Sequence, residues 1–369
     1  MRNKSKIENG KLARTNKLLL SLCCSAFGLL VAVSCVKDTP VYNEKEIRFG
    51  ITNVSRALVT DMSNLEDQEV GVYGYYTATE RWVWSTLNVT PNLTANYFFN
   101  KKLEYDGTEW GYGTPKYWPP DTINKISFFA YAPYVDVSGA NGITPYPSAK
   151  TDAGSPFLNY VVPANVNDQV DLIWDSKIDM SHAHAPVMFD MKHALTRISF
   201  TAAFATSESS KNYTAKIKEI SLSGVHGQGD LDLVTGIWYP YTLVPPKADY
   251  VLQDGPAGTL IDVPFNSTNY ATDYDPKPLI KDNHYLMLIP QNITDETILN
   301  FTLEITIQSP PSVPVTTAIA VPLKPIIAKW EPGQAVEFNL VIKGDFIAVV
   351  TNLTSWRLPI DPSTGNVDF

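Results

Sequence analysis

Short segments that are apolar or alternate between apolar and polar residues recur along most of the chain. Examples are VGVYGYY (70–76), KISFFAYAPY (125–134) and HYLMLIPQ (284–291), and most are bounded by Gly, Pro, Asn or Asp. Such segments are typical of β-strands. Further examples are TRISFTAAF (196–204), AKIKEISLSGV (215–225), NFTLEITIQ (300–308) and AVEFNLVI (335–342). Because no stretch of twelve residues shows a 3.6-residue period, we expect an all-β protein built from sandwiches.

The length of 369 residues suffices for two domains of ordinary size. A polar, turn-rich stretch, SKIDMSHAHAP, lies at 176–186, and a new apolar series begins at Val187. We therefore expect an N-terminal β-sandwich over 57–184 and a C-terminal β-sandwich over 185–343. We expect residues 344–369 to form a C-terminal strand segment, with a donor strand as one interpretation.

The first 34 residues resemble a lipoprotein signal peptide. Six Lys and Arg residues precede an apolar run from Leu18 to Val33, which is shorter than the roughly 20 residues that a membrane-spanning helix needs. The run ends in Ala32-Val33-Ser34-Cys35, which resembles a lipobox. Cleavage between Ser34 and Cys35 would leave Cys35 to carry lipid such as palmitate, and residues 35–56 would follow as a lipidated tether and first strand.

Charge argues against nucleic-acid binding, and the cysteine content argues against a fold held by disulfides. The formal net charge is −9, and without residues 1–34 it becomes −14, which disfavours nucleic acid as a partner. Cys23 and Cys24 lie inside the signal, so only Cys35 remains afterwards and no disulfide is expected.

Three groups of residues are candidates for sites of chemistry. His182 and His184 stand at strand spacing near Asp179 and could bind a metal, although a polar loop is the simpler interpretation. The many Asp and Glu residues mark out no glycosidase pair. An aromatic cluster could stack on glycans or form core: Trp82, Trp84, Trp110, Tyr112, Tyr117 and Trp118. Nucleophile elbows, phosphate loops and dinucleotide fingerprints are absent from the sequence, so we expect no enzyme, no cofactor and no metal.

Seven segments, in order, resemble the fimbrillin family of Bacteroidota, in particular the branch of minor fimbrium (Mfa-like) subunits. They are IRFGITNVSRA (47–57), VGVYGYY (70–76), YWPPDTINKISFFAYAPY (117–134), PVMFDMKHALTRISFTA (186–202), GDLDLVTGIW (229–238), LMLIPQ (286–291) and WEPGQAVEFNLVI (330–342). The resemblance implies two tandem transthyretin-like β-sandwiches. It also implies export as a lipoprotein anchored in the outer membrane, with an adhesive role among the functions expected of such fimbriae.

In that family an Arg-specific protease cuts a loop after the first strand, and a strand from a neighbouring subunit fills the groove that opens. Here Arg56-Ala57 occupies the position of the cleavage loop, with Arg48 and Arg81 as competing sites. Ile47, Phe49 and Ile51 alternate with polar residues and would form the removable strand. Repeated exchange would give a head-to-tail polymer of subunits, an extracellular fimbrium.

The C-terminal segment leaves two interpretations open. FIAVVTNL (346–353) is typical of a strand, and Trp356 and Leu358 could anchor a second piece. The segment is either the donor strand or part of the C-terminal sandwich. Asp121-Thr122-Ile123 resembles an O-glycosylation acceptor with Thr122 modified. The alternative function is a monomeric surface lipoprotein that binds glycans or host proteins through its loops.

Overall fold

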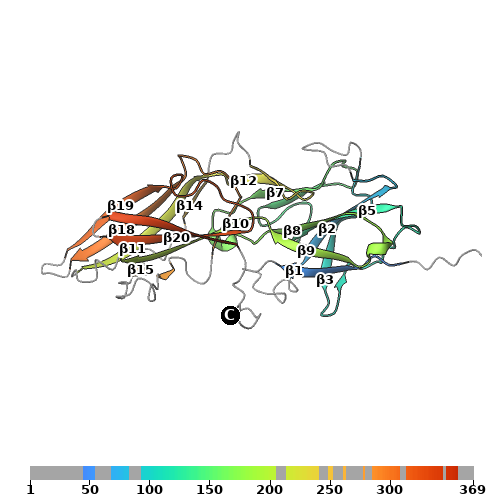
Figure 1. Ribbon diagram of the computed structural model, residues 1–369, viewed down its shortest axis with the longest axis horizontal. Coiled ribbons are helices and arrows are strands. Elements are labelled where there is room, and N and C mark those ends of the chain that lie inside the picture. The colour runs from blue at the N-terminus through green and yellow to red at the C-terminus, as the bar shows by residue number, and fades with distance from the viewer. Residues whose placement is uncertain are drawn as a thin grey trace, which may run out of the picture. The chain divides into compact units, whose positions relative to one another are not determined.

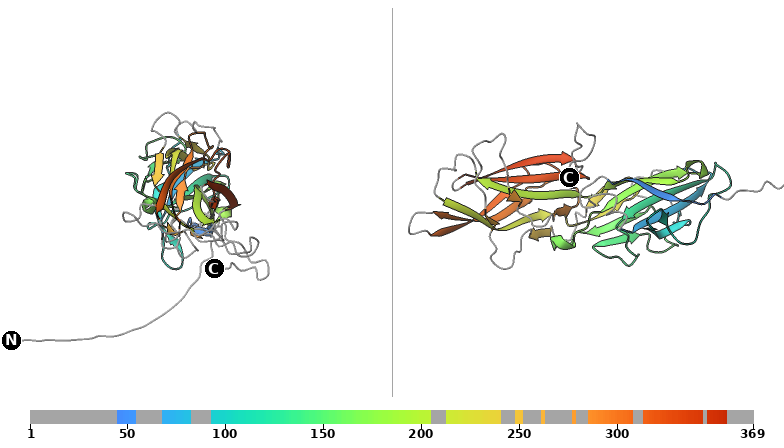
Figure 2. Two further views of the ribbon diagram at one scale, coloured as in Figure 1. Left: turned by 90° about the vertical axis from the view of Figure 1, so that its left-hand side faces the viewer. Right: turned by 90° about the horizontal axis from the view of Figure 1, so that it is seen from below.

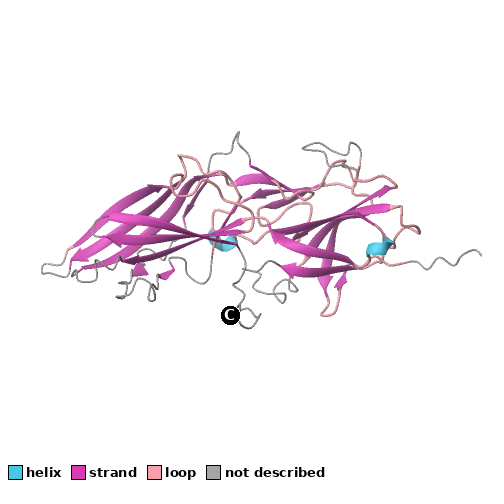
Figure 3. Cartoon of the chain, in the orientation of Figure 1, coloured by secondary structure: helices cyan, strands magenta, loops and turns pink. Residues whose placement is uncertain are grey.

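The computed structural model describes residues 45–54, 68–82, 93–204, 213–240, 248–251, 261–262, 277–278, 285–307, 313–343 and 346–355. These residues belong to a compact unit that spans 44–369. Within the described ranges nearly all regular structure is β-strand, as Figure 3 shows. The exceptions are two 3-10 turns, η1 (Val166–Asp168) and η2 (His182–His184). The predicted all-β class is confirmed, and no described helix has the length and apolar character to span a bilayer.

The N-terminal strands close into a barrel in the order β1-β4-β3-β2-β5-β8-β9. The strands are β1 (Phe49–Val54), β2 (Val70–Ala78), β3 (Phe98–Tyr105), β4 (Trp110–Gly111), β5 (Lys125–Ala132), β8 (Ile173–Met180) and β9 (Val187–His193). The blue strand β1 lies beside the green strand β9, although the two are far apart in sequence (Figures 1 and 2). Their pairing is parallel, and the other pairs of the barrel are antiparallel.

Three further sheets contain the remaining described strands. Their orders are β16-β10-β20-β21 with β17 also on β10, β14-β11-β18-β19 with β15 also on β11, and β13-β12-β7-β6. The predicted strands of the C-terminal half correspond to β10 (Thr196–Phe204), β11 (Tyr213–Val225), β17 (Leu286–Leu288), β18 (Ile298–Ile307) and β20 (Gln334–Lys343), although β17 covers only three residues of the predicted 284–291. The other strands are β6 (Ile143–Tyr146), β7 (Phe157–Val161), β12 (Gln228–Asp232), β13 (Trp238–Pro240), β14 (Ala248–Val251), β15 (Ile261–Asp262), β16 (Lys277–Pro278), β19 (Pro314–Pro322) and β21 (Phe346–Ser355).

The predicted boundary at 184/185 falls between strands that pair with each other. β9 begins after this point but belongs to the N-terminal barrel. β7 and β12 lie on opposite sides of it and form one antiparallel ladder, from Phe157 opposite Asp232 to Val161 opposite Gln228. The division into two tandem sandwiches therefore stays a prediction.

Two cores explain why β2 and β5 are apolar on both faces. Val72 of β2 and Phe128 of β5 face the barrel core, whereas Tyr73 and Phe129 face a second core that continues into the C-terminal strands. A strand buried on both sides has no need of polar residues at alternate positions. β9, in contrast, alternates strictly between buried and exposed residues, because one face points to solvent.

Candidate functional site: the first strand and its groove

The segment 45–54 completes the barrel between β4 and β9. Phe49, Gly50 and Ile51 are paired with Val187, Met188 and Phe189 of β9, and Phe49 is also opposite Trp110 of β4. Ahead of β1, Glu46 forms an isolated antiparallel bridge with Tyr117. The segment therefore has a paired neighbour on each side, and its loss would open the barrel.

The burial of this segment alternates as predicted, although the strand β1 begins at Phe49 and Ile47 lies ahead of it. Ile47, Phe49 and Ile51 have exposed fractions of 0%, 5% and 7%. The Phe49 ring lies among four other rings, with centroid distances of 5.4, 5.6, 5.4 and 5.8 Å to those of Phe98, Tyr112, Phe128 and Phe189. Burial of side chains of this size contributes about 1.5–3 kcal/mol each. These three residues fill the groove that the rest of the barrel leaves.

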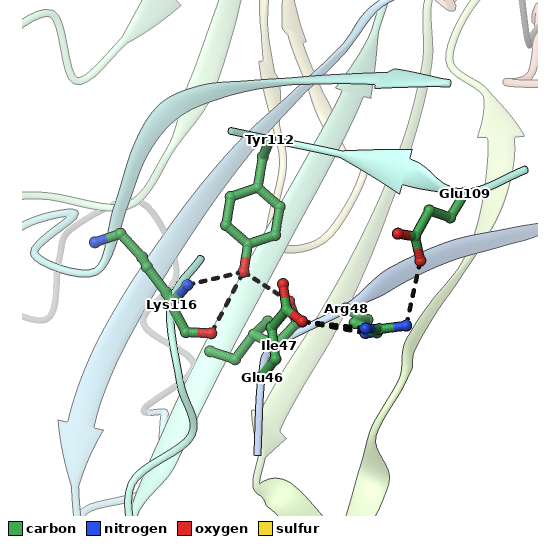
Figure 4. A network of polar contacts seen from close by, with 6 residues as sticks. All are labelled: Glu46, Ile47, Arg48, Glu109, Tyr112 and Lys116. Atoms are coloured by element: carbon green, nitrogen blue, oxygen red, sulfur yellow. Dashed lines mark hydrogen bonds and ion pairs between the residues drawn. The ribbon is translucent and has the colours of Figure 1, made fainter. Parts of the chain in front are cut away.

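The segment is also held by hydrogen bonds that do not belong to a β-ladder. The Ile47 N–H donates to the carbonyl of Lys116 and the Trp118 N–H donates to that of Lys45, both at 2.8 Å. The Tyr112 hydroxyl donates to the Ile47 carbonyl at 2.7 Å and accepts from the Lys116 N–H at 3.1 Å (Figure 4). Burial raises the pKa of Tyr112, so the phenol keeps the proton that it donates.

Ion pairs lie at the rim of the groove. The Arg48 guanidinium contacts Glu46 at 3.2 Å and Glu109 at 3.3 Å (Figure 4). The side chains of Arg48 and Glu109 are 62% and 58% exposed, so water screens these contacts. The sequence pattern did not indicate that Glu109 or Lys116 would contact this segment. The strand β4 between them has only two residues, too few to show an alternating pattern.

The predicted processing residues Ser34, Cys35, Arg56 and Ala57 lie outside the described residues. Of the two competing arginines, Arg48 precedes β1 directly and its carbonyl accepts from the Val187 N–H at 2.8 Å. Arg81 is exposed in a non-strand segment next to the buried Trp82. A paired backbone resists proteolysis, so of the two, Arg81 is the more accessible competitor.

Four of the six rings of the aromatic cluster are buried in the core, which overturns a glycan-stacking role for those four. Trp82, Trp110 and Trp118 are only 5%, 6% and 2% exposed, and Tyr112 is 8% exposed. Tyr117 alone among the described members is exposed, at 41%, and Trp84 lies outside the described residues. Rings buried in this way present no face to a sugar.

The two histidines at strand spacing have separate contacts. His182 Nδ1 lies 3.4 Å from the Pro119 carbonyl, and His184 Nδ1 accepts from the Ser181 N–H at 3.1 Å. The Asp179 carboxylate accepts from the Trp82 N–H at 2.8 Å. Within the described ranges, no three His, Cys, Asp or Glu side chains gather in a way that could hold a metal ion.

Thr122 is exposed in a bend ahead of β5, where a modifying enzyme could reach its hydroxyl. Asp121 accepts from the N–H groups of Ile123 and Asn124, at 3.1 and 2.9 Å, and thereby orders this bend. O-glycosylation of Thr122 stays a prediction, which mass spectrometry of protein from the native host would test.

The C-terminal strand segment is paired within its own chain. β21 runs antiparallel to β20, with Phe346 opposite Lys343 and Ser355 opposite Gln334. FIAVVTNL therefore forms the strand that was predicted and completes the sheet β16-β10-β20-β21. Trp356 and Leu358 follow β21 and lie outside the described residues.

Comparison with known proteins identifies the family. A family profile described as "Fimbrillin-like" matches residues 56–356. A stretch of 138 residues is 30% identical to the fimbrium subunit Fim1C of Phocaeicola vulgatus, and this match spans 35% of this chain and 35% of that relative. A fimbrial protein of Bacteroides vulgatus of known crystal structure has a similar fold, with a TM-score of 0.66 and 20% identity over 85% of this chain and 100% of that one. Because the profile covers well over half of the chain, the predicted family is confirmed, and this protein belongs to the fimbrillin-like family.

Proposed function

We propose that the protein is a structural subunit of a fimbrium that polymerises by strand exchange at the groove of β1. The subunit is exported as a lipoprotein on Cys35, anchored in the outer membrane and cut after Arg56. The segment 45–54 then leaves with the lipid, and a strand of a neighbouring subunit takes its place. The observation that carries the proposal is the burial of Ile47, Phe49 and Ile51 in a barrel that this segment completes.

Loss of the segment 45–54 leaves the barrel open. β4 and β9 lose their common neighbour, so backbone N–H and C=O groups on both become unpaired. The rings of Phe98, Phe128 and Phe189 lose the Phe49 ring that packs among them. An incoming strand with the same alternation restores both the ladder and the burial. Since this exchange is head-to-tail and does not close on itself, it builds a filament.

Arg56 is well placed for this role in the sequence, two residues after Val54, the last residue of β1. A cut there separates the whole of β1 from the rest of the barrel. The family consists of structural subunits and not of enzymes, which agrees with a role through assembly.

The proposal is tested with lipidated precursor extracted from cells and treated with an Arg-specific protease. We expect a new N-terminus at Ala57 and a ladder of multimers that survives mild denaturant. Arg56→Ala should abolish both, and Arg81→Ala is the matched control that should change neither. Trimmed protein that stays monomeric at high concentration would refute strand exchange, and normal trimming of the Arg56→Ala variant would refute the assigned site.

A further inference from the structure

β19 (Pro314–Pro322) forms a sheet edge that no other strand covers in the described part of the chain. It ends the order β14-β11-β18-β19 and pairs with β18 along its whole length of nine residues (Figure 1). Seven of the nine residues are exposed, and Val315 is 56% exposed. A long exposed edge offers unpaired backbone N–H and C=O groups to a strand of another molecule.

The even-numbered residues of β19 direct their backbone groups away from β18. Directly after the strand, the Leu323 N–H donates to the Thr297 carbonyl at 3.0 Å, and these two residues continue the register of the ladder. Because residues of an edge strand alternate between bonding to the neighbour and facing outward, the odd residues bond to β18. Pro314 and Pro322 are even-numbered, so the N–H that each lacks is one that β18 would not use. The outward N–H and C=O groups between the two prolines belong to Thr316, Ala318 and Ala320.

β19 lacks the charged residues that usually protect such an edge. Its sequence, PVTTAIAVP, contains no Asp, Glu, Lys or Arg. The opposite end of the same sheet, β14, has only four residues and includes Asp249. Because the whole chain carries a net charge of −9, two copies repel each other on average, and that repulsion is weakest at an uncharged edge. β19 is therefore the end of this sheet that is open to pairing.

The sequence of β19 is nearly the same when it is read from either end. Residues at equal distances from Ala318 are identical or similar in size and branching. The matching pairs are Pro314 and Pro322, Val315 and Val321, Thr316 and Ala320, and Thr317 and Ile319. A strand that pairs with its own copy about a two-fold axis meets its own sequence in reverse, and near-symmetry of this kind suits such pairing. β21 also ends a sheet and has no charge, but its sequence, FIAVVTNLTS, has no such symmetry.

We propose that β19 is a self-association surface, which pairs antiparallel with β19 of a second copy about a two-fold axis at Ala318. The outward groups of Thr316 bond to those of Ala320 in the second copy, and the two Ala318 residues bond to each other. The two sheets then continue as one, and Val315 lies opposite Val321 of the second copy. This pairing goes beyond the proposed function and does not depend on exchange at the groove of β1.

Backbone hydrogen bonding selects this register among the alternatives. A slip by one residue places outward groups opposite groups that already bond to β18, so it is excluded. A slip by two residues places a proline opposite Ala320 or Thr316, and the carbonyl of that residue then has no N–H to accept from. Only the register centred on Ala318 pairs every outward N–H and C=O group between the two prolines.

The dimer should be weak, because two short strands make a small contact. Standard interfaces bury roughly 1,600 Å², and smaller ones belong to transient complexes. We expect the dimer to be populated at about 0.1 mM protein and to dissociate at about 1 μM. Sedimentation of the chain from Val36 onward, with Arg56→Ala to prevent cleavage, measures this. That chain contains the whole compact unit 44–369 and no cysteine.

Cysteine crosslinking in the same protein tests the register. Ala318→Cys should form a disulfide-linked dimer, since residues in a hydrogen-bonded antiparallel pair lie about 5.5 Å apart at Cα, within the range of a disulfide. Thr316→Cys should not link to itself, because the two copies of residue 316 would be offset by about 13 Å along the strands. A mixture of Thr316→Cys and Ala320→Cys should give the mixed disulfide. All three positions are exposed, so the substitutions disturb no core.

We expect Ala318→Cys to crosslink at least several-fold more than Thr316→Cys alone. Preference for a disulfide between Ala318→Cys and either Thr316→Cys or Ala320→Cys would overturn the register. Sedimentation as a monomer at 0.1 mM, with no disulfide at any of these positions, would overturn the surface itself. Since Arg56→Ala protein is not cut, such a failure would leave the proposed strand exchange untouched.

A lysine at the centre of the edge then tests whether β19 carries the association. Ala318→Lys places two positive charges opposite each other and should weaken dimerisation at least 10-fold. Ala149→Lys is the matched control, because it makes the same change at an exposed alanine outside any strand and should leave dimerisation unchanged. Urea unfolding of both variants verifies that they fold. A folded Ala318→Lys variant that dimerises as well as the parent protein would show that the association uses another surface and would overturn the proposal.

Discussion

The first and last described strands differ in how their own fold holds them. β1 lies between two strands, and its Phe49 and Ile51 are 5% and 7% exposed. β21 lies at the end of its sheet order with β20 as its neighbour, and its Leu353 is 50% exposed. A strand with two neighbours and a buried face is integral to a core, whereas an edge strand contributes less to stability. In this protein, therefore, the segment proposed to leave is the one on which its own core depends more.

The largest expected effect distinguishes these two strands. In uncleaved Arg56→Ala protein, Phe49→Ala should lower the free energy of unfolding by about 3–5 kcal/mol, because it leaves a cavity among four rings. Leu353→Ala should cost less than about 1 kcal/mol, since half of its side chain already contacts water. Urea unfolding of both variants measures the difference, and equal losses would contradict the comparison.

A smaller effect is expected from the hydroxyl that holds the segment ahead of β1. Tyr112→Phe removes one bond to the Ile47 carbonyl and one from the Lys116 N–H, which should cost about 1–3 kcal/mol. Tyr146→Phe removes a single exposed bond, to the Ala153 carbonyl at 3.1 Å, and should cost less. A Tyr112→Phe variant as stable as wild type in the same urea assay would show that β1 is held by its apolar face alone.

Alkaline pH should lower the free energy of unfolding through Tyr73. This residue lies on the face of β2 that packs in the second core, not in the core that contains Phe49 of β1. Burial, followed by the neighbouring Tyr131 and Tyr75, raises the pKa of Tyr73 well above its usual value of about 10. The folded state therefore keeps this proton while the unfolded state releases it. Stability is unaffected below pH 10 and falls above it, by about 1.4 kcal/mol per pH unit for this residue.

Urea unfolding between pH 9 and pH 11 measures this loss, and the Tyr73→Phe variant should show a shallower decline than wild type. Equal slopes for the two proteins would mean that the Tyr73 pKa is not raised by folding. The Phe49→Ala variant should keep the wild-type slope, because Phe49 and Tyr73 belong to different cores.

The smallest effect is expected at the rim. Glu109→Gln in uncleaved protein should lower stability by less than about 1 kcal/mol, and the loss should shrink with added salt, because the pair with Arg48 is exposed. Glu331→Gln breaks a pair with Lys329 of similar exposure, at 2.9 Å, and should have an effect of the same size. A much larger loss for Glu109→Gln would mean that this residue stabilises the precursor itself.

Local patterns predicted some strands and missed others for identifiable reasons. The alternation of Ile47, Phe49 and Ile51 indicated a buried face, and their burial confirms it. β8 extends to Met180, whereas the sequence from 176 onward suggested a linker. The pattern suggested a linker because polar residues interrupt the apolar ones, and five of the eight residues of β8 are only half-buried. The sequence did not predict β4, because a strand of two residues is too short to show an alternating pattern. The sequence showed that aromatic residues cluster between Trp82 and Trp118, but it left open whether their rings are buried, as four of them are.

By itself, the sequence determined that this chain is built of strands, which residues of the first strand share a face, and where Arg56 and Cys35 stand. These properties depend on the two-residue period and on short motifs, which are local. Only the tertiary structure decided that β1 pairs in parallel with β9, that Phe49 lies among four rings, and that Glu109 meets Arg48 across 61 residues of chain. Pairing and register depend on contacts between distant segments, and the burial of both strands at once selects among arrangements that each strand alone leaves open.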